Sequence, residues 1–176
     1  MGMRLLIDGY NLMFQSIAVE HRLDGMNALR VARGKLMQLL IDLIEESDRD
    51  QTMIVFDAKE APPGLPDKYH HHGIQIVFAR DWDSADELIQ TEIRKHPTPK
   101  QLTVVSSDHA IHRKALAKGA KVLDSDEWLD DQFDSLERKR RDAMHFSTNE
   151  EEAHEDIKQR QLSEEEMKKW LNDFGF

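Results

Sequence analysis

The alternation of short apolar runs with helical patterns is the feature that most constrains how this chain can fold. Four runs rich in β-branched and aliphatic residues are predicted strands, and a fifth run is weaker. They are Leu5 to Ile7, Met53 to Phe56, Ile74 to Phe78, Leu102 to Val105 and, as the weaker one, Lys121 to Leu123. Because the first four are continuously apolar rather than alternating, they indicate a sheet that is covered on both faces.

Helical patterns separate these runs. Apolar residues recur at helical spacing from Asp24 to Glu46, where Asp24 is the expected N-cap. Further helices are predicted over Ser84 to His96, Asp108 to Lys118 and Asp126 to Asp142, the first stopped by Pro97 and the second ending at Gly119. This order predicts a doubly wound α/β fold with a mainly parallel, five-stranded, Rossmann-like sheet. We expect its strands in the order 3-2-1-4-5, with helices on both faces.

The C-terminal part has a different character. We expect an α/β domain over residues 1–142, a charged linker over residues 143–161 and a short amphipathic helix within residues 162–176. Ser163 and Glu166 form a capping box for that helix, and Trp170 and Phe174 lie on its apolar face. Because so short a helix is unstable alone, we expect it to pack against its own domain, a second copy of the chain or a protein partner.

Composition narrows the class of protein. The chain has no cysteine, so neither disulfides nor a thiolate zinc site are possible, which agrees with a reducing cytoplasm. No signal-peptide pattern precedes the first strand, and no run of residues approaches the ~20 apolar residues that span a bilayer. We therefore expect a soluble, cytoplasmic protein without a membrane partner.

Charge does not exclude a nucleic-acid partner, although the chain carries a net charge of −10. Residues 125–176 hold 16 acidic and 8 basic side chains, a net of −8, which leaves −2 for residues 1–124. The acidity is therefore concentrated in the C-terminal part, and overall charge cannot decide which partner the first part binds.

Four aspartates follow the predicted strands. Asp8, Asp57 and Asp108 end the first, second and fourth strands, and Asp86 lies in the first turn of the helix after the third strand. In a doubly wound sheet these positions share the carboxyl edge, where ligands bind. Carboxylates gathered there would repel one another, and Mg²⁺ or Mn²⁺ would relieve the repulsion and could support phosphodiester hydrolysis. Aspartate is also a common cap or turn residue, so position alone leaves both interpretations open.

Five segments carry a resemblance to a known family. They are Ile7 to Leu12 (IDGYNL), Ala32 to Leu36 (ARGKL), Val55 to Ala58 (VFDA), Ser84 to Ile89 (SADELI) and Val104 to Asp108 (VVSSD). In order and spacing, over roughly residues 3 to 130, they resemble the NYN domains, relatives of the PIN nucleases, and especially the bacterial YacP-like branch. Within each segment the resemblance is weak, but the ordered set is fairly specific.

The resemblance implies a PIN-like fold and a metal-dependent endoribonuclease that acts on RNA. It implies that Asp8, Asp86 and Asp108 bind the metal, with Asp57 as a less constant ligand. Asn11, three residues after Asp8, is implied to orient a ligand or water and so to share in catalysis.

Other side chains have competing interpretations. Arg33 and Lys35, with Arg113, could contact RNA phosphates, or could be ordinary surface charge. Trp82 could stack on a base, but packing is the favoured interpretation. His109 and His112 could touch a phosphate, but a solvated helix face is favoured. His70 to His72 are expected in an exposed loop, where a metal-binding role is disfavoured.

Two other functions remain open. An RNA-binding adaptor could keep this fold without useful catalysis, but it would not need repelling carboxylates in its cleft. A phosphoacceptor that uses Asp8 as its nucleophile is disfavoured, because the first strand ends Asp-Gly-Tyr-Asn without the second Asp of an Asp-x-Asp pattern.

Overall fold

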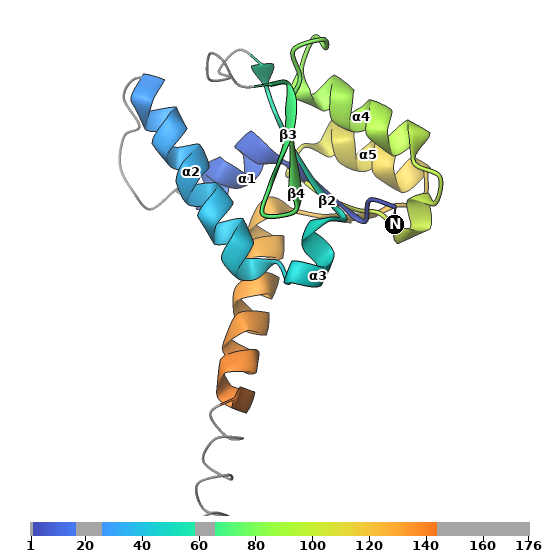
Figure 1. Cartoon of the computed structure of the whole chain (residues 1–176). Coiled ribbons are helices and arrows are strands. Elements are labelled where there is room, and N and C mark those ends of the chain that lie inside the picture. The colour runs from blue at the N-terminus through green and yellow to red at the C-terminus, as the bar shows by residue number, and fades with distance from the viewer. Residues whose placement is uncertain (1, 17–25, 59–65, 144–176) are drawn as a thin grey trace, which may run out of the picture. The chain divides into compact units, whose positions relative to one another are not determined.

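The computed structural model describes residues 2–16, 26–58 and 66–143 (Figure 1). The chain divides into two compact units, Met1–Phe133 and Asp134–Phe176. The first unit contains the whole sheet and is described below. The predicted linker and the predicted C-terminal helix lie beyond residue 143, outside the described residues, so the domain boundaries stay predictions.

A six-stranded sheet forms the centre of the first unit, in the order β3-β4-β2-β1-β5-β6. The strands are β1 (Leu5–Asp8), β2 (Thr52–Phe56), β3 (Lys68–His71), β4 (Ile74–Phe78), β5 (Thr103–Val105) and β6 (Lys121–Leu123). All neighbours are parallel except β3 and β4. The five predicted strands occur in the predicted order, and the mainly parallel α/β fold is confirmed.

The sixth strand, β3, corrects the expectation of a loop at His70 to His72. His70 and His71 belong to β3, which pairs with β4 through a two-residue turn of His72 and Gly73. Both turn residues have positive φ, 49° and 91°, as the hairpin turns that match strand twist require. Polar, exposed side chains such as those of Lys68 and His70 suit an edge strand, which is why an apolar pattern did not reveal it.

Helices cover both faces of the sheet. They are α1 (Gly9–Ser16), α2 (Met26–Leu43), α3 (Glu46–Arg49), α4 (Ala85–Lys95) and α5 (His109–Ala117), and residues 125–143 are also helical. Figure 1 shows α1 and α2 on one face and α4 and α5 on the other. Neither α1 nor α3 was predicted, and Asp24, the expected N-cap of α2, lies outside the described residues. No helix within residues 2–16, 26–58 and 66–143 is long and apolar enough to cross a membrane.

The predicted starts of α4 and α5 are confirmed, whereas α2 ends at Leu43, before the predicted end at Glu46, which belongs to α3. The Ser84 side chain accepts a hydrogen bond from the Glu87 amide at the start of α4, and Asp108 caps α5. Gly119, with φ of 79°, follows the C-terminal end of α5, a position where a side chain would be strained. These caps fix where α4 and α5 begin, and therefore where Asp86 and Asp108 stand.

Alternate residues of each central strand pack into different cores. Leu6, Val55 and Val104 pack with α4 and α5, whereas Ile7, Ile54 and Phe56 are buried on the opposite face. Both faces of the central strands are therefore buried, as their continuous apolar runs predict.

Gly9 allows α1 to begin directly against β2. A Cβ at this position would lie 2.5 Å from Phe56 Cε1 and 2.8 Å from the Val55 carbonyl oxygen. Gly34, in the middle of α2, is the contrasting glycine, because a Cβ there would meet no atom within 4 Å.

We expect Gly9→Ala to lower the free energy of unfolding by about 1–3 kcal/mol, the usual cost of overpacking a core. Gly34→Ala is the matched control and should raise it by up to about 1 kcal/mol, since alanine is the better helix former. Urea denaturation of both variants measures the difference. Equal stabilities would contradict the close packing of α1 on β2.

Candidate active site

Four carboxylates stand at the carboxyl edge of the sheet. Asp8 is the last residue of β1, Asp57 follows β2, and Asp108 is the N-cap of α5 after β5. Asp86 is the second residue of α4. Because β1 lies between β2 and β5 and runs parallel to both, the ends of these strands meet at one edge.

Asp8 is the most buried of the four, with 8% of its surface exposed. Its Oδ1 accepts a hydrogen bond from the Asn11 amide at 3.2 Å, and its Oδ2 accepts one from the Ser106 hydroxyl at 3.0 Å. Its pKa is raised from 3.8 to about 6, mainly by burial and in smaller part by the charges of Asp86 and Asp108, against the opposing effect of these hydrogen bonds. A pKa raised in this way indicates surroundings that disfavour the negatively charged form of Asp8.

Asp86 shares this electrostatic environment although the residue is exposed. Partial burial of its carboxyl group raises its pKa, and the charges of Asp108 and Asp57 add to the effect. The four carboxylates therefore interact. Asp86 and Asp108 raise the pKa of Asp8, and Asp108 and Asp57 raise the pKa of Asp86. No cation of the described residues is among the causes of either shift.

Ser106 links two of these aspartates and was not singled out by the sequence. Its hydroxyl donates to Asp8 and accepts a hydrogen bond from the Asp108 amide at 3.1 Å. The side chain is fully buried. In the sequence, Ser106 is marked only by its position two residues before the N-cap of a helix. Its partner Asp8 lies 98 residues away, so the sequence does not indicate the hydrogen bond between them.

Asn11 holds the loop that follows β5. Its side-chain oxygen accepts hydrogen bonds from the Ser107 amide at 3.0 Å and the Ser125 hydroxyl at 2.8 Å. In this arrangement Asn11 is a positioning residue, because its oxygen fixes the backbone beside Asp108. Ser125, which is fully buried, is a second residue that sequence reasoning missed.

Two histidines accompany this loop. The half-buried His112 makes a short hydrogen bond from Nε2 to the Ser106 carbonyl oxygen and lies 3.9 Å from Asp124. His109 is exposed, as the expected solvated helix face requires. His112 therefore supports the Ser106 backbone.

The four carboxylates have the chemistry that a hard divalent cation prefers, although in the described residues they do not form a complete metal-binding site. Within the described part of the chain, no three histidine or acidic side chains are gathered closely enough to hold a metal ion as they stand. Oδ1 of Asp108 is engaged by the Ala110 and Ile111 amides at 2.5 and 3.2 Å. The chemistry of the side chains fits such a cation. They are oxygen donors that repel one another at one edge of the sheet, and Mg²⁺ and Mn²⁺ prefer oxygen ligands.

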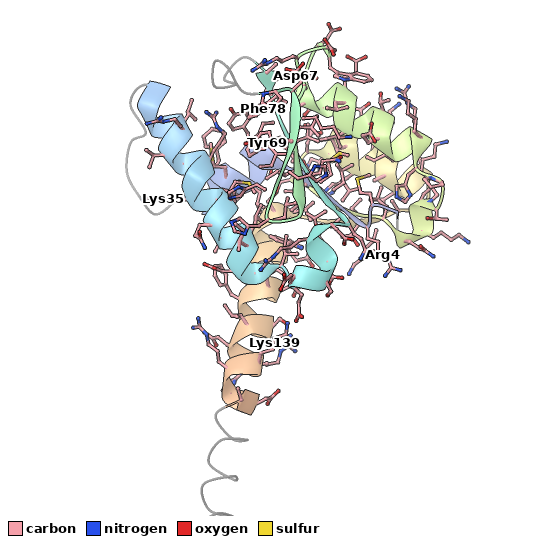
Figure 2. The ribbon with its side chains drawn as sticks, in the orientation of Figure 1. Arg4, Lys35, Asp67, Tyr69, Phe78 and Lys139 are labelled. Carbon is pink, nitrogen blue, oxygen red and sulfur yellow. The ribbon has the colours of Figure 1, made fainter. Side chains whose placement is uncertain are left out.

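The predicted RNA contacts fall on two different faces. Arg33 and Lys35 lie on α2, while Arg113 is exposed on α5, across the sheet (Figure 1). Lys35 is exposed (Figure 2), whereas Arg33 is 8% exposed and donates a hydrogen bond to the Tyr10 hydroxyl at 2.8 Å. The three side chains therefore do not form one continuous phosphate-binding surface, and their contact with RNA stays a prediction.

Trp82 packs against the core, as the favoured interpretation of the sequence predicts. It lies against the core on the α4 and α5 face, with the Lys95 ammonium 5.9 Å from the ring centroid.

An α/β domain of this topology, with coupled aspartates at the carboxyl edge, has the form of a PIN-like nuclease domain. The family model of the YacP-like NYN domain matches residues 5–173, and the chain belongs to this family. The match extends well beyond the segment, about residues 3 to 130, that carried the resemblance.

Relatives and solved structures agree with the family. The uncharacterized protein YacP of Bacillus subtilis is 27% identical over 119 residues, which span 66% of this chain and 66%, just under two thirds, of that protein. The crystal structure of Rae1 (YacP) from Bacillus subtilis has a TM-score of 0.61 at 25% identity, covering 99% of this chain and 96% of that one. The crystal structure of a mutant form of the same Bacillus subtilis protein also gives a TM-score of 0.61, at 22% identity over 84% and 85% of the two chains.

The raised pKa of Asp8 makes stability depend on pH. Because the folded pKa of about 6 exceeds the unfolded value of 3.8, the folded state keeps its proton to a higher pH. The free energy of unfolding therefore falls as the pH rises through this interval and stays lower above it, by about 3 kcal/mol.

We expect Asp8→Asn, in buffer without divalent ions, to be more stable than the unsubstituted chain by about 1–3 kcal/mol near pH 8 and by little near pH 4. Urea denaturation across this range measures the difference. Asp81→Asn, which changes an exposed carboxylate before α4, is the control. A stability difference that does not vary with pH would contradict the burial of an ionised Asp8.

Proposed function

We propose that this protein is a metal-dependent endoribonuclease that hydrolyses RNA phosphodiester bonds at the carboxylate cluster, with Mg²⁺ or Mn²⁺. The nuclease-like character of the NYN family supports the reaction class. The observation that carries the proposal is the mutual electrostatic effect of Asp8, Asp57, Asp86 and Asp108 at one sheet edge. Carboxylates kept together at the cost of repulsion suit a site that binds a cation.

Asp8, Asp86 and Asp108 would hold the metal, with Asp57 beside them. A bound divalent ion lowers the pKa of a water nucleophile and stabilises negative charge on the phosphate. The protein's own contribution is to fix the ligands, since rotation of a ligand away from its productive position weakens such a site. Ser106 holds the Asp8 carboxylate, and Asn11 holds the loop that leads to Asp108.

The metal can be tested through stability. A ligand that binds only the folded state stabilises it, by about 2.7 kcal/mol at a hundred times its dissociation constant. Millimolar Mg²⁺ or Mn²⁺ should therefore raise the melting temperature by several degrees, at about 2–4 °C for each kcal/mol. The rise should shrink in Asp8→Asn and persist in Asp81→Asn. A melting temperature indifferent to both ions would count against the metal site.

Catalysis is tested by incubating the purified protein with mixed cellular RNA, with and without Mn²⁺. Asp8→Asn and Asp108→Asn should each reduce cleavage by at least about a hundred-fold, the scale of losing a group that stabilises transition-state charge. Asparagine is also a good N-cap, so Asp108→Asn should keep α5 intact. His70→Ala, on the polar edge strand, should cleave normally.

Two outcomes separate the alternatives. Wild-type cleavage by both aspartate variants would overturn the proposed mechanism. Tight RNA binding by the unsubstituted chain without any cleavage would favour the RNA-binding adaptor.

A further inference from the structure

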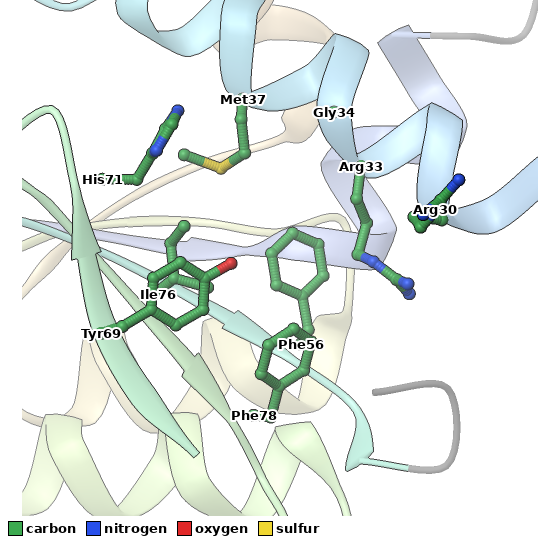
Figure 3. A pocket seen from close by; sticks show the side chains of 9 residues that line it. All are labelled: Arg30, Arg33, Gly34, Met37, Phe56, Tyr69, His71, Ile76 and Phe78. Carbon is green, nitrogen blue, oxygen red and sulfur yellow. The ribbon is translucent and has the colours of Figure 1, made fainter. Parts of the chain in front are cut away.

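A cavity of about 230 Å³ lies between α2 and the strands β2, β4 and β3 (Figure 3). Figure 1 shows α2 on the face of the sheet opposite α4 and α5. Phe56, Phe78 and Tyr69 line it from the sheet, and Arg30, Arg33 and Gly34 line it from α2. The metal-site hypothesis uses none of these side chains. The cavity is smaller than the ~300–1,000 Å³ pockets that enclose drug-sized ligands, so it suits a single planar ring system with its substituents.

The sheet side of the cavity is a row of aromatic rings. Phe56 and Phe78 stack with centroids 5.7 Å apart and an interplanar angle of 29°, and Tyr69 stacks on Phe78 at 6.4 Å and 25°. Figure 3 shows the Tyr69 ring beside those of Phe56 and Phe78 at the cavity. Phe56 and Phe78 are almost fully buried, whereas Tyr69 is partly exposed, so the Tyr69 ring is the one that can attract another flat ring system.

The helix side contributes positive charge. Arg33 donates to the Tyr10 hydroxyl, and its charge also acts on Tyr69, whose pKa burial nonetheless raises. The Tyr69 phenol is therefore neutral and retains its proton to donate. Arg30 is exposed at the same helix face, where an anion could reach it. Aromatic rings beside arginines form a combination that recognises a base together with its phosphate.

Gly34 keeps the cavity open at the helix. Residues 30, 34 and 37 follow helical spacing and all line the cavity, so a side chain at position 34 would project toward it. Glycine inside a helix costs about 1 kcal/mol relative to alanine. No atom lies within 4 Å of a Cβ built there, so packing does not require the glycine, whereas a large side chain at this position would occupy the cavity.

One residue that lines the cavity, Phe56, is a neighbour of the carboxylates in the sequence. Phe56 immediately precedes Asp57, and the Tyr10 ring, which meets Phe56 edge-on at 5.2 Å, belongs to the second residue after Asp8. A strand bound at the carboxylates could therefore extend to the cavity around the end of β2.

We propose that this cavity binds one nucleobase of a single-stranded RNA, stacked against the Tyr69 ring, while Arg30 and Arg33 attract the adjoining phosphate. The subsite rests on the proposed function, because it holds a nucleotide of the same strand that the carboxylate cluster cleaves. Its role is to position that strand, and it takes no part in breaking the bond.

The test compares Gly34→Leu, which fills the cavity, with Gly34→Ala, which changes helix propensity similarly but adds only a methyl group. The probe is a fluorescently labelled, short single-stranded RNA of mixed sequence, with affinity measured by anisotropy in buffer without divalent ions. Gly34→Leu should weaken binding about five-fold to a hundred-fold, the range of losing one base–aromatic stack, and Gly34→Ala should bind within about two-fold of the unsubstituted chain. Tyr69→Ala, with Tyr69→Phe as its control, tests the same subsite from the sheet side.

The outcomes distinguish this subsite from the proposed function. If the unsubstituted chain cleaves RNA and all four variants bind the probe as it does, the subsite is overturned while the nuclease stands. If the unsubstituted chain neither binds nor cleaves RNA, the proposed function fails and the subsite fails with it. Binding of adenosine monophosphate as tightly as the RNA probe would make the cavity a mononucleotide site and overturn the RNA subsite. The Mg²⁺-induced rise in melting temperature should be the same in Gly34→Leu, since that variant leaves the carboxylates unchanged.

Discussion

The hydrogen bonds around the buried Asp8 carboxylate join segments that are far apart in the sequence. One oxygen is held by the first turn of α1 and the other by Ser106, which also receives the Asp108 amide. Asn11 extends the connection to Ser107 and to Ser125. The positions of β1, α1 and the start of α5 therefore depend on one another, and the carboxyl edge of the sheet is fixed as a unit.

This arrangement keeps negative charges together at a cost to folding. Burial and the neighbouring charges raise the pKa of Asp8 to about 6, which corresponds to about 3 kcal/mol at neutral pH. A domain of ordinary stability, about 5–15 kcal/mol, can tolerate that loss when both faces of its sheet are well packed. An energetic cost of this kind is typical of functional sites, because amides in place of the carboxylates would give a more stable edge.

The sequence could predict what depends on local pattern. Four continuous apolar runs and one weaker run located the five parallel strands, and the doubly wound topology predicted their order. The rule that ligands bind at the carboxyl ends of strands indicated the edge where the aspartates meet. Local pattern failed at β3, whose polar residues have the composition of a loop and become a strand only because β4 offers a free edge. It also failed for the Ser106 and Ser125 bonds, which span 98 and 114 residues, because partners so distant leave no periodic signal.

Phe56 connects the cavity under α2 to the carboxyl edge of the sheet. One edge of its ring lies 2.5 Å from where a Cβ at Gly9 would stand, and the ring stacks on Phe78 at the cavity. Gly9 in turn directly follows Asp8, so any movement of the Phe56 ring presses on the turn that holds the Asp8 carboxylate. Close-packed interiors transmit such displacements rather than absorbing them. A ligand that reorients Phe56 in the cavity would therefore shift the Asp8 end of the carboxylate cluster, which gives the aromatic row a physical route to influence these carboxylates.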